Sequence, residues 1–120
     1  MLFRSCDELK LIVYVPKLDY FLHSPFVSRI NRIIFLPKSF VEHFEGRGEE
    51  LKFVIAHEVG HVVLGRGSSE ILADEFAASI LSPQIGIEAL RHSATYGWFR
   101  YLGVSMDDRI EALKNMKPFS

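Results

Sequence analysis

The chain has 120 residues, 48% of them hydrophobic and 24% charged, which predicts one folded domain over residues 1–120 and excludes a mainly disordered chain. A formal net charge of −1 argues against a nucleic-acid-binding protein, because such proteins carry an excess of basic residues. The single cysteine, Cys6, excludes an internal disulfide, and no apolar run approaches the roughly 20 residues of a membrane-spanning helix, so we expect a cytoplasmic protein with no membrane partner.

The N-terminal third predicts two strands. Residues 9–15 are β-branched and apolar, which indicates a buried strand. Residues 26–36 contain a second strand, placed most firmly at 32–36, with Asn31 as a turn residue before it. Residues 17–25 are ambiguous. These strands predict a small twisted sheet.

Five helices are expected in the rest of the chain, from capping residues, prolines and apolar spacing. Pro37 is expected at the first helical position of the first helix. The last helix should open with Ser105, whose capping partner is Asp108. The sequence therefore predicts an α+β fold, in which the sheet packs on the second helix and three further helices lie below it. The expected ranges are 38–45, 48–64, Ser68 or Ser69 to about Leu81, Pro83 to Tyr96, and Ser105 to a point before Pro118.

His57, Glu58 and His61 form an HExxH motif within the helix expected at 48–64. One helical turn separates the two histidines, so both rings lie on one face and can reach the same metal ion. Glu58 then lies where its carboxylate can accept a proton from a water activated by the metal. The alternative is a pair of core histidines without a metal, but burying them with Glu58 among uncharged neighbours would be costly. The spacing therefore predicts a catalytic zinc site.

Catalytic zinc requires a third protein ligand, and the helix after the motif offers three acids. Glu70 follows His61 by nine residues across a glycine-containing turn and is the first candidate, the alternative being an acid that only complements the helix dipole. Asp74 lies one turn further on the same face, where it can accept the free ring N–H of a ligand histidine. Glu75 points about 100° away and is expected in solvent.

The remaining histidines carry less information. His23, His43 and His92 are expected to be ordinary surface or packing residues. A donor for the oxyanion that forms during peptide hydrolysis is still needed. The sequence leaves that role open among His92, Tyr96 and Tyr101.

The pairing of HEVGH at 57–61 with EILAD at 70–74 resembles the HExxH plus ExxAD signature of gluzincin-type zinc peptidases, notably the CAAX-prenyl-protease and HtpX-like catalytic domains. The resemblance implies a zinc-ligand role for His57, His61 and Glu70, a catalytic acid/base role for Glu58, and support of a ligand by Asp74. The stretch 73–83, followed by 103–105 and Arg109-Ile110, is also similar to ImmA/IrrE-type peptidases, although these usually have Glu-Ala-Asn at 72–74.

The CAAX-protease-like domains are embedded in membranes, whereas this chain has no spanning stretch. It therefore resembles the small soluble scaffolds called minigluzincins. Those generally use a histidine as third ligand, which keeps His92 as the alternative to Glu70. They are also held latent by their own C-terminal segments, which implies that the segment after Gly103 covers the cleft here.

These features predict a zinc-dependent metalloendopeptidase that acts on a peptide or protein substrate. An edge strand near Arg32–Leu36 is expected to hold that substrate extended. One alternative is an ImmA/IrrE-like regulatory protein linked to DNA, and another is a zinc-stabilised interaction module that cleaves nothing. Substrate preference and oligomeric state do not follow from the sequence.

Overall fold

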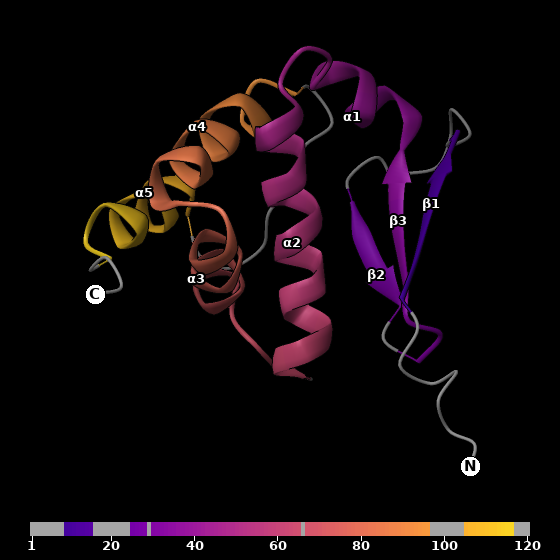
Figure 1. The fold of residues 1–120 in the computed structure, drawn as a ribbon, viewed down its shortest axis with the longest axis horizontal. Coiled ribbons are helices and arrows are strands. Elements are labelled where there is room, and N and C mark those ends of the chain that lie inside the picture. Colours follow the sequence, from indigo (N-terminus) through magenta and orange to yellow (C-terminus); the bar gives the residue numbers. More distant parts are fainter. Residues whose placement is uncertain (1–8, 16–24, 29, 66, 97–104, 117–120) are drawn as a thin grey trace.

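The computed structural model describes residues 9–15, 25–28, 30–65, 67–96 and 105–116. They form a small three-stranded sheet and five helices, so the expected α+β class is confirmed (Figure 1). None of these helices is long and apolar enough to cross a membrane. The elements in chain order are β1 (Lys10–Tyr14), β2 (Phe26–Ser28), β3 (Ile33–Pro37), α1 (Lys38–His43), α2 (Gly48–Leu64), α3 (Glu70–Ile80), α4 (Pro83–Ser93) and α5 (Met106–Lys114).

The sheet has the order β1-β3-β2, with β1 parallel and β2 antiparallel to the central strand β3. Residues 30–32 form a turn directly before β3, and the backbone N–H of Asn31 donates to Ser28 Oγ at 3.4 Å. The turn expected at Asn31 is therefore confirmed. The segment 26–36 contains two strands, one on each side of that turn, where the sequence predicted one.

Two expectations about the sheet are wrong. The strand expected at 9–15 forms, but its side chains are largely exposed, 48% for Leu11 and 50% for Val13, and within the described residues β1 pairs only with β3. The strand expected at 32–36 as a substrate-binding edge is the central strand. Both of its edges are paired and Ile34 is buried, so it has no open edge for a peptide.

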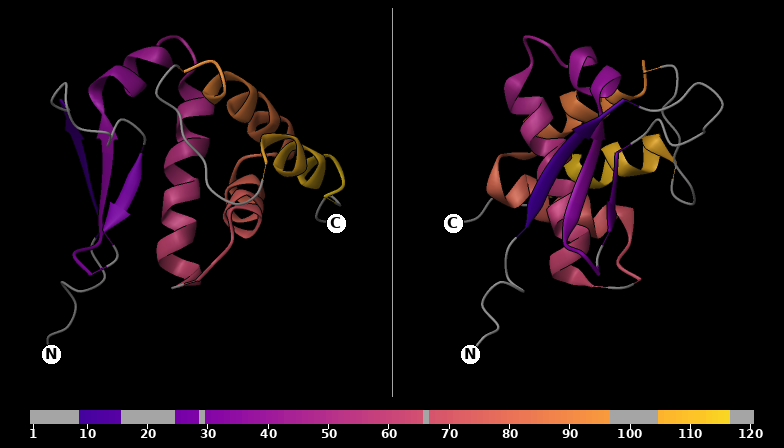
Figure 2. Two further views of the ribbon diagram at one scale, coloured as in Figure 1. Left: turned by 180° about the vertical axis from the view of Figure 1, so that it is seen from behind. Right: turned by 90° about the vertical axis from the view of Figure 1, so that its right-hand side faces the viewer.

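Helix α2 lies between the sheet and the group formed by α3, α4 and α5 (Figures 1 and 2). Phe53 of α2 enters the main core, where it meets Ala77 of α3, Leu90 of α4 and Leu113 of α5. A second cluster joins α1 to the end of α4. Because α2 is packed on both sides, its polar residues His57, Glu58 and His61 lie in the interior of the protein.

Candidate metal centre

The two motif histidines lie one turn apart on α2, with ring centroids 4.8 Å from each other. Glu49 and Glu50 occupy the first turn of this helix, where acidic side chains interact favourably with the N-terminal dipole. Only 6% of His57 and 8% of His61 is exposed. The histidines thus form a buried pair on one face of a rigid helix.

A glycine-containing turn brings α3 back against α2. Gly65 and Gly67 have φ values of 92° and 84°, a left-handed conformation that residues with a side chain rarely adopt. Ser69 then caps α3 by accepting a hydrogen bond from a backbone N–H in its first turn. Glu70, the first residue of α3, consequently faces the two histidines.

Glu70 completes a cluster of three side chains. Its Oε1 atom lies 2.8 Å from Nε2 of His57 and 3.4 Å from Nε2 of His61. The ligand-type atoms of the three residues all lie within 4.8 Å of one another. The structure therefore brings together the three residues that the sequence singled out.

The other nitrogen of each ring is also held. Nδ1 of His57 lies 2.8 Å from Oδ1 of Asp74, and Nδ1 of His61 lies 3.0 Å from Oγ of Ser68. When each Nδ1–H donates to its oxygen, Nε2 is left to point into the cluster with a free electron pair. Asp74 was expected in this role, whereas Ser68 was considered only as a helix cap.

Arg109 of α5 is a residue of the site to which the sequence assigned no role. Its Nε and one terminal nitrogen donate to the two carboxylate oxygens of Asp74, at 2.7 and 2.8 Å. Asp74 is fully buried and Arg109 is 5% exposed. Burial alone would raise the pKa of Asp74, but the hydrogen bonds from Arg109 and His57 outweigh it and lower that pKa.

The contacts of His57 also favour a proton on Nε2, the atom that would bind a metal. Both ring nitrogens of His57 face a carboxylate, so both must donate, as they do in an imidazolium. Burial disfavours that charge, but the hydrogen bonds to Asp74 and Glu70 raise the pKa of His57 to about 9. The hydrogen bonds from His57 and His61 hold the pKa of Glu70 well below its usual range.

Glu58 is placed differently from the other acids. It is 9% exposed, and within the described part of the chain its carboxyl group forms no hydrogen bond or ion pair. Burial raises the pKa of its carboxyl group, against the attraction of His57 and His61. Buried polar groups are normally hydrogen-bonded, so this unpaired carboxyl group requires an explanation.

The donor set of His57, His61 and Glu70 could hold a divalent metal ion. Two imidazole nitrogens and one carboxylate oxygen are typical ligands of catalytic zinc. Among the described residues, three acids at the centre, Glu58, Glu70 and Asp74, interact with one permanent cation, Arg109. A divalent ion would balance the remaining negative charge, whereas the metal-free protein needs protons to do so.

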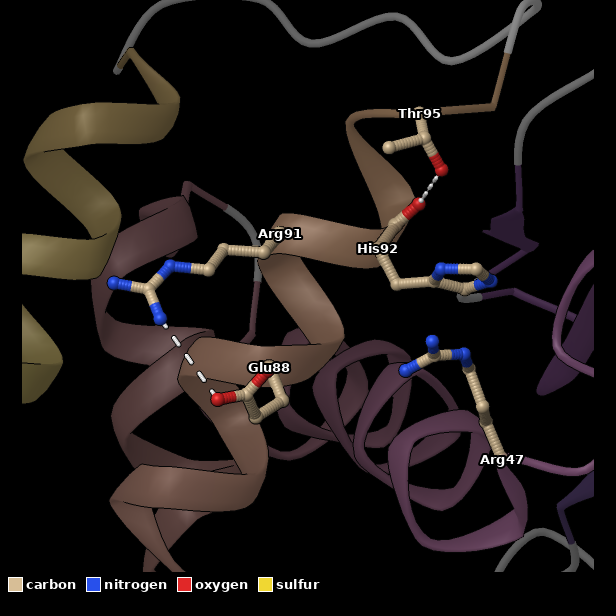
Figure 3. Close-up of a pocket in the computed structure, with 5 residues that line it drawn as sticks. All are labelled: Arg47, Glu88, Arg91, His92 and Thr95. Carbon is tan, nitrogen blue, oxygen red and sulfur yellow. Dashed lines mark hydrogen bonds and ion pairs between the residues drawn. The ribbon is translucent and has the colours of Figure 1, made fainter.

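The other candidates lie elsewhere. The ring of His92 stacks on His43 with centroids 4.1 Å apart, and each histidine contacts a backbone carbonyl of the other through Nε2. Figure 3 shows His92 beside Arg47 at a surface pocket. Tyr96 is buried against α1, where its hydroxyl lies 2.6 Å from Oγ of Ser39.

Among the described residues His92 is therefore not part of the cluster at Glu70. Glu75, expected in solvent, is half-buried on α3 and also does not belong to the cluster. His23 and Tyr101 lie outside the described residues. With these contacts, neither His92 nor Tyr96 lies in the cluster where an oxyanion donor is needed.

Comparison of the chain with models of known protein families, with curated proteins and with solved structures found no match. The function of the protein must therefore be inferred from the geometry of the cluster.

Proposed function

We propose that the protein is a zinc-dependent peptidase of the gluzincin type, with His57, His61 and Glu70 as zinc ligands. The observation that carries the proposal is Glu58, a buried carboxyl group without a hydrogen bond to the described residues, on the same helix as two of the ligands. A structural zinc site is usually closed by four protein ligands and has no need of such a group. The cluster offers three donors among the described residues, which leaves room for a water molecule.

Each residue of the centre has a part in this proposal. Bound zinc would polarise the carbonyl group of a peptide bond and lower the pKa of a water molecule. Glu58 would accept the proton of that water and deliver it to the leaving amine. Its raised pKa suits this exchange, because an acid/base catalyst works best when its pKa lies near the working pH. Asp74 and Ser68 would hold the two ligand rings.

Substrate would bind along the sheet edge nearest to the centre. Because β3 is the central strand, this edge belongs to β2, which contacts α2 and pairs only with β3 within the described residues (Figure 1). An extended peptide adding to β2 would lie beside α2. This proposal replaces the substrate position first expected at 32–36.

A Glu58→Gln variant tests the assigned chemistry. It should retain zinc, because Glu58 is not a ligand, and lose about 10²- to 10⁴-fold in turnover of a broad peptide library. Glu75→Gln makes the same chemical change on α3, outside the cluster, and should cleave as the wild type does. Cleavage by wild type should stop when a chelator is added. Wild-type rates in Glu58→Gln would show that Glu58 is not the base.

The second candidate is a zinc-stabilised module that regulates or binds without cleaving. It shares the metal site but gives Glu58 no function, so zinc binding alone does not separate the two. If the wild type cleaves no peptide, the protein can be a peptidase only in a latent form, with its cleft covered by the C-terminal segment. Of that segment, which begins after Gly103, residues 104 and 117–120 lie outside the described residues.

A further inference from the structure

We infer that helix α5 belongs to the metal centre, and that Arg109 is a positioning residue that acts on the ligand His57 through Asp74. Metal occupancy and the docking of α5 against α3 would then be coupled. The inference rests on the metal site proposed above. It adds to that site a residue 35 positions beyond Asp74, on a helix that contains no part of the motif.

The geometry of the contact supports positioning rather than simple charge pairing. Two nitrogens of Arg109 donate to the two oxygens of Asp74, at 2.7 and 2.8 Å, so the plane of the carboxylate is fixed. Oδ1 of Asp74 also accepts from Nδ1 of His57 at 2.8 Å. The orientation of the carboxylate, set by Arg109, therefore sets the direction of the imidazole ring.

Burial makes the arrangement depend on every member. Asp74 is fully buried, and His57 and Arg109 are 6% and 5% exposed. Water therefore has little access to replace a lost hydrogen bond. Removing Arg109 would leave Asp74 with a buried charge whose only other hydrogen-bond partner among the described residues is His57. The carboxylate would then be free to rotate, or would take up a proton.

The position of Arg109 on α5 connects the site to the core. Leu113 follows it by one turn on the same face and is 1% exposed in the core, next to Phe53 of α2. One face of α5 thus makes an apolar contact and an ionic contact with the rest of the protein. Undocking of α5 would release Asp74, and by reciprocity a metal that requires an oriented His57 would favour the docked helix.

The experiment compares zinc affinity in wild type, Arg109→Met and Arg109→Lys, measured by competition with a chromophoric chelator on protein shown to be folded. Ile110→Ala is the matched control, because Ile110 is a half-buried neighbour on α5 that packs against the core. Arg109→Met should bind zinc about 10- to 100-fold more weakly than wild type, as expected when the partner of a ligand histidine is disturbed. Arg109→Lys should lose less, because lysine keeps the charge but not the two-pronged contact.

Two further measurements separate positioning from stability. Ile110→Ala should lower the melting temperature without changing zinc affinity more than about twofold. In the Asp74→Ala background, Arg109→Met should cause no additional loss of affinity, because the oxygen atoms that join Arg109 to His57 are already absent. The visible spectrum of the cobalt-substituted protein should change in Arg109→Met and stay unchanged in Ile110→Ala.

The inference is overturned if Arg109→Met, or Arg109→Lys should the first variant not fold, binds zinc within about twofold of wild type. It is also overturned if addition of zinc does not slow amide hydrogen exchange in α5 of the wild type. A wild type that binds no zinc gives a distinct result, since it removes the metal site itself and with it the proposed function.

Discussion

Zinc should compete with a proton for Nε2 of His57, so the apparent zinc affinity should depend steeply on pH. The hydrogen bonds of His57 to Asp74 and Glu70 raise its pKa to about 9, from an ordinary value of 6.5. Below pH 9 each unit of pH should therefore weaken binding about tenfold, because one proton must be displaced. Between about pH 8.5 and pH 6.5 the loss should be about 100-fold, or about 2.7 kcal/mol.

The same proton gives the metal-free protein a different dependence of stability on pH. A group whose pKa is raised by folding stabilises the folded state below its unfolded pKa, and this contribution is lost as pH rises through the folded pKa. For His57 the window runs from about 6.5 to about 9, and its size is about 3 kcal/mol. The metal-free melting temperature should fall across this window. The zinc-loaded protein should show no such fall, because its His57 carries no proton on Nε2.

Isothermal titration calorimetry in buffers of different ionisation enthalpy measures the protons released. At about pH 7.5 His57 should contribute about one proton per zinc bound. Glu58→Gln is the control, because it removes the nearby acid whose pKa is raised and should still release the proton of His57. Asp74→Asn should move the pH dependence to lower pH, because it removes one of the two carboxylates that hold the proton. Equal affinity at the two ends of this pH range with no proton release would refute the argument.

The packing and the caps give further predictions. Gly86→Ala should destabilise the protein by about 1–3 kcal/mol in chemical denaturation, because a Cβ there would lie 2.6 Å from the ring of Phe53. Gly48→Ala, in the first turn of α2 with no atom within 4 Å of the added carbon, should be neutral or slightly stabilising, and a loss of stability there would contradict the packing explanation. Ser69→Ala and Ser82→Ala each remove a helix cap and should each cost about 1 kcal/mol, but only Ser69→Ala should also weaken zinc binding, since its helix begins with a ligand.

The helices could be predicted because the signals that start and end them are local. The range expected at 48–64 agrees with α2, and the serines expected before α3 and α5 are the observed caps. A cap involves residues only three positions apart, as in the bond from the N–H of Asp108 to Ser105, so it is visible in the sequence. The helix expected to reach Tyr96 ends earlier, at Ser93, where consecutive turns replace the regular pattern.

The sheet was harder to predict, because strand order depends on contacts between distant segments. An apolar run such as 9–15 is typical of a strand buried on both faces, and its composition does not distinguish a central strand from an edge. In the structure the hairpin of β2 and β3 lies nearer to α2, and β1 lies at the far edge (Figure 1). The burial of β1 and the edge position of 32–36 were therefore both predicted incorrectly, because the sequence does not give the order of the strands.

In the candidate site, too, residues close in sequence were predicted and a residue far along the chain was not. His57, Glu70 and Asp74 are found within 18 residues on two consecutive helices, so helical spacing and the short glycine-containing connection between the helices bring them to one place. Arg109 lies 35 positions beyond Asp74, and its contact depends on how α5 packs. The cue in the sequence was weak: an arginine one turn before Leu113, on the face of α5 that enters the core.

The unspecified positions of the motif also carry structural information, as Gly60 shows. A Cβ at Gly60 would lie 3.1 Å from the side chain of Phe76 and 3.3 Å from the Cα atom of Ala73, so α3 can approach α2 this closely because Gly60 has no side chain. Ala73 is followed directly by Asp74, which bonds to His57 at 2.8 Å. A larger residue at position 60 would push α3 outward at the point where it supports the metal ligand. Gly60 therefore helps to set the distance between α2 and α3, and with it the contact of Asp74 that orients His57.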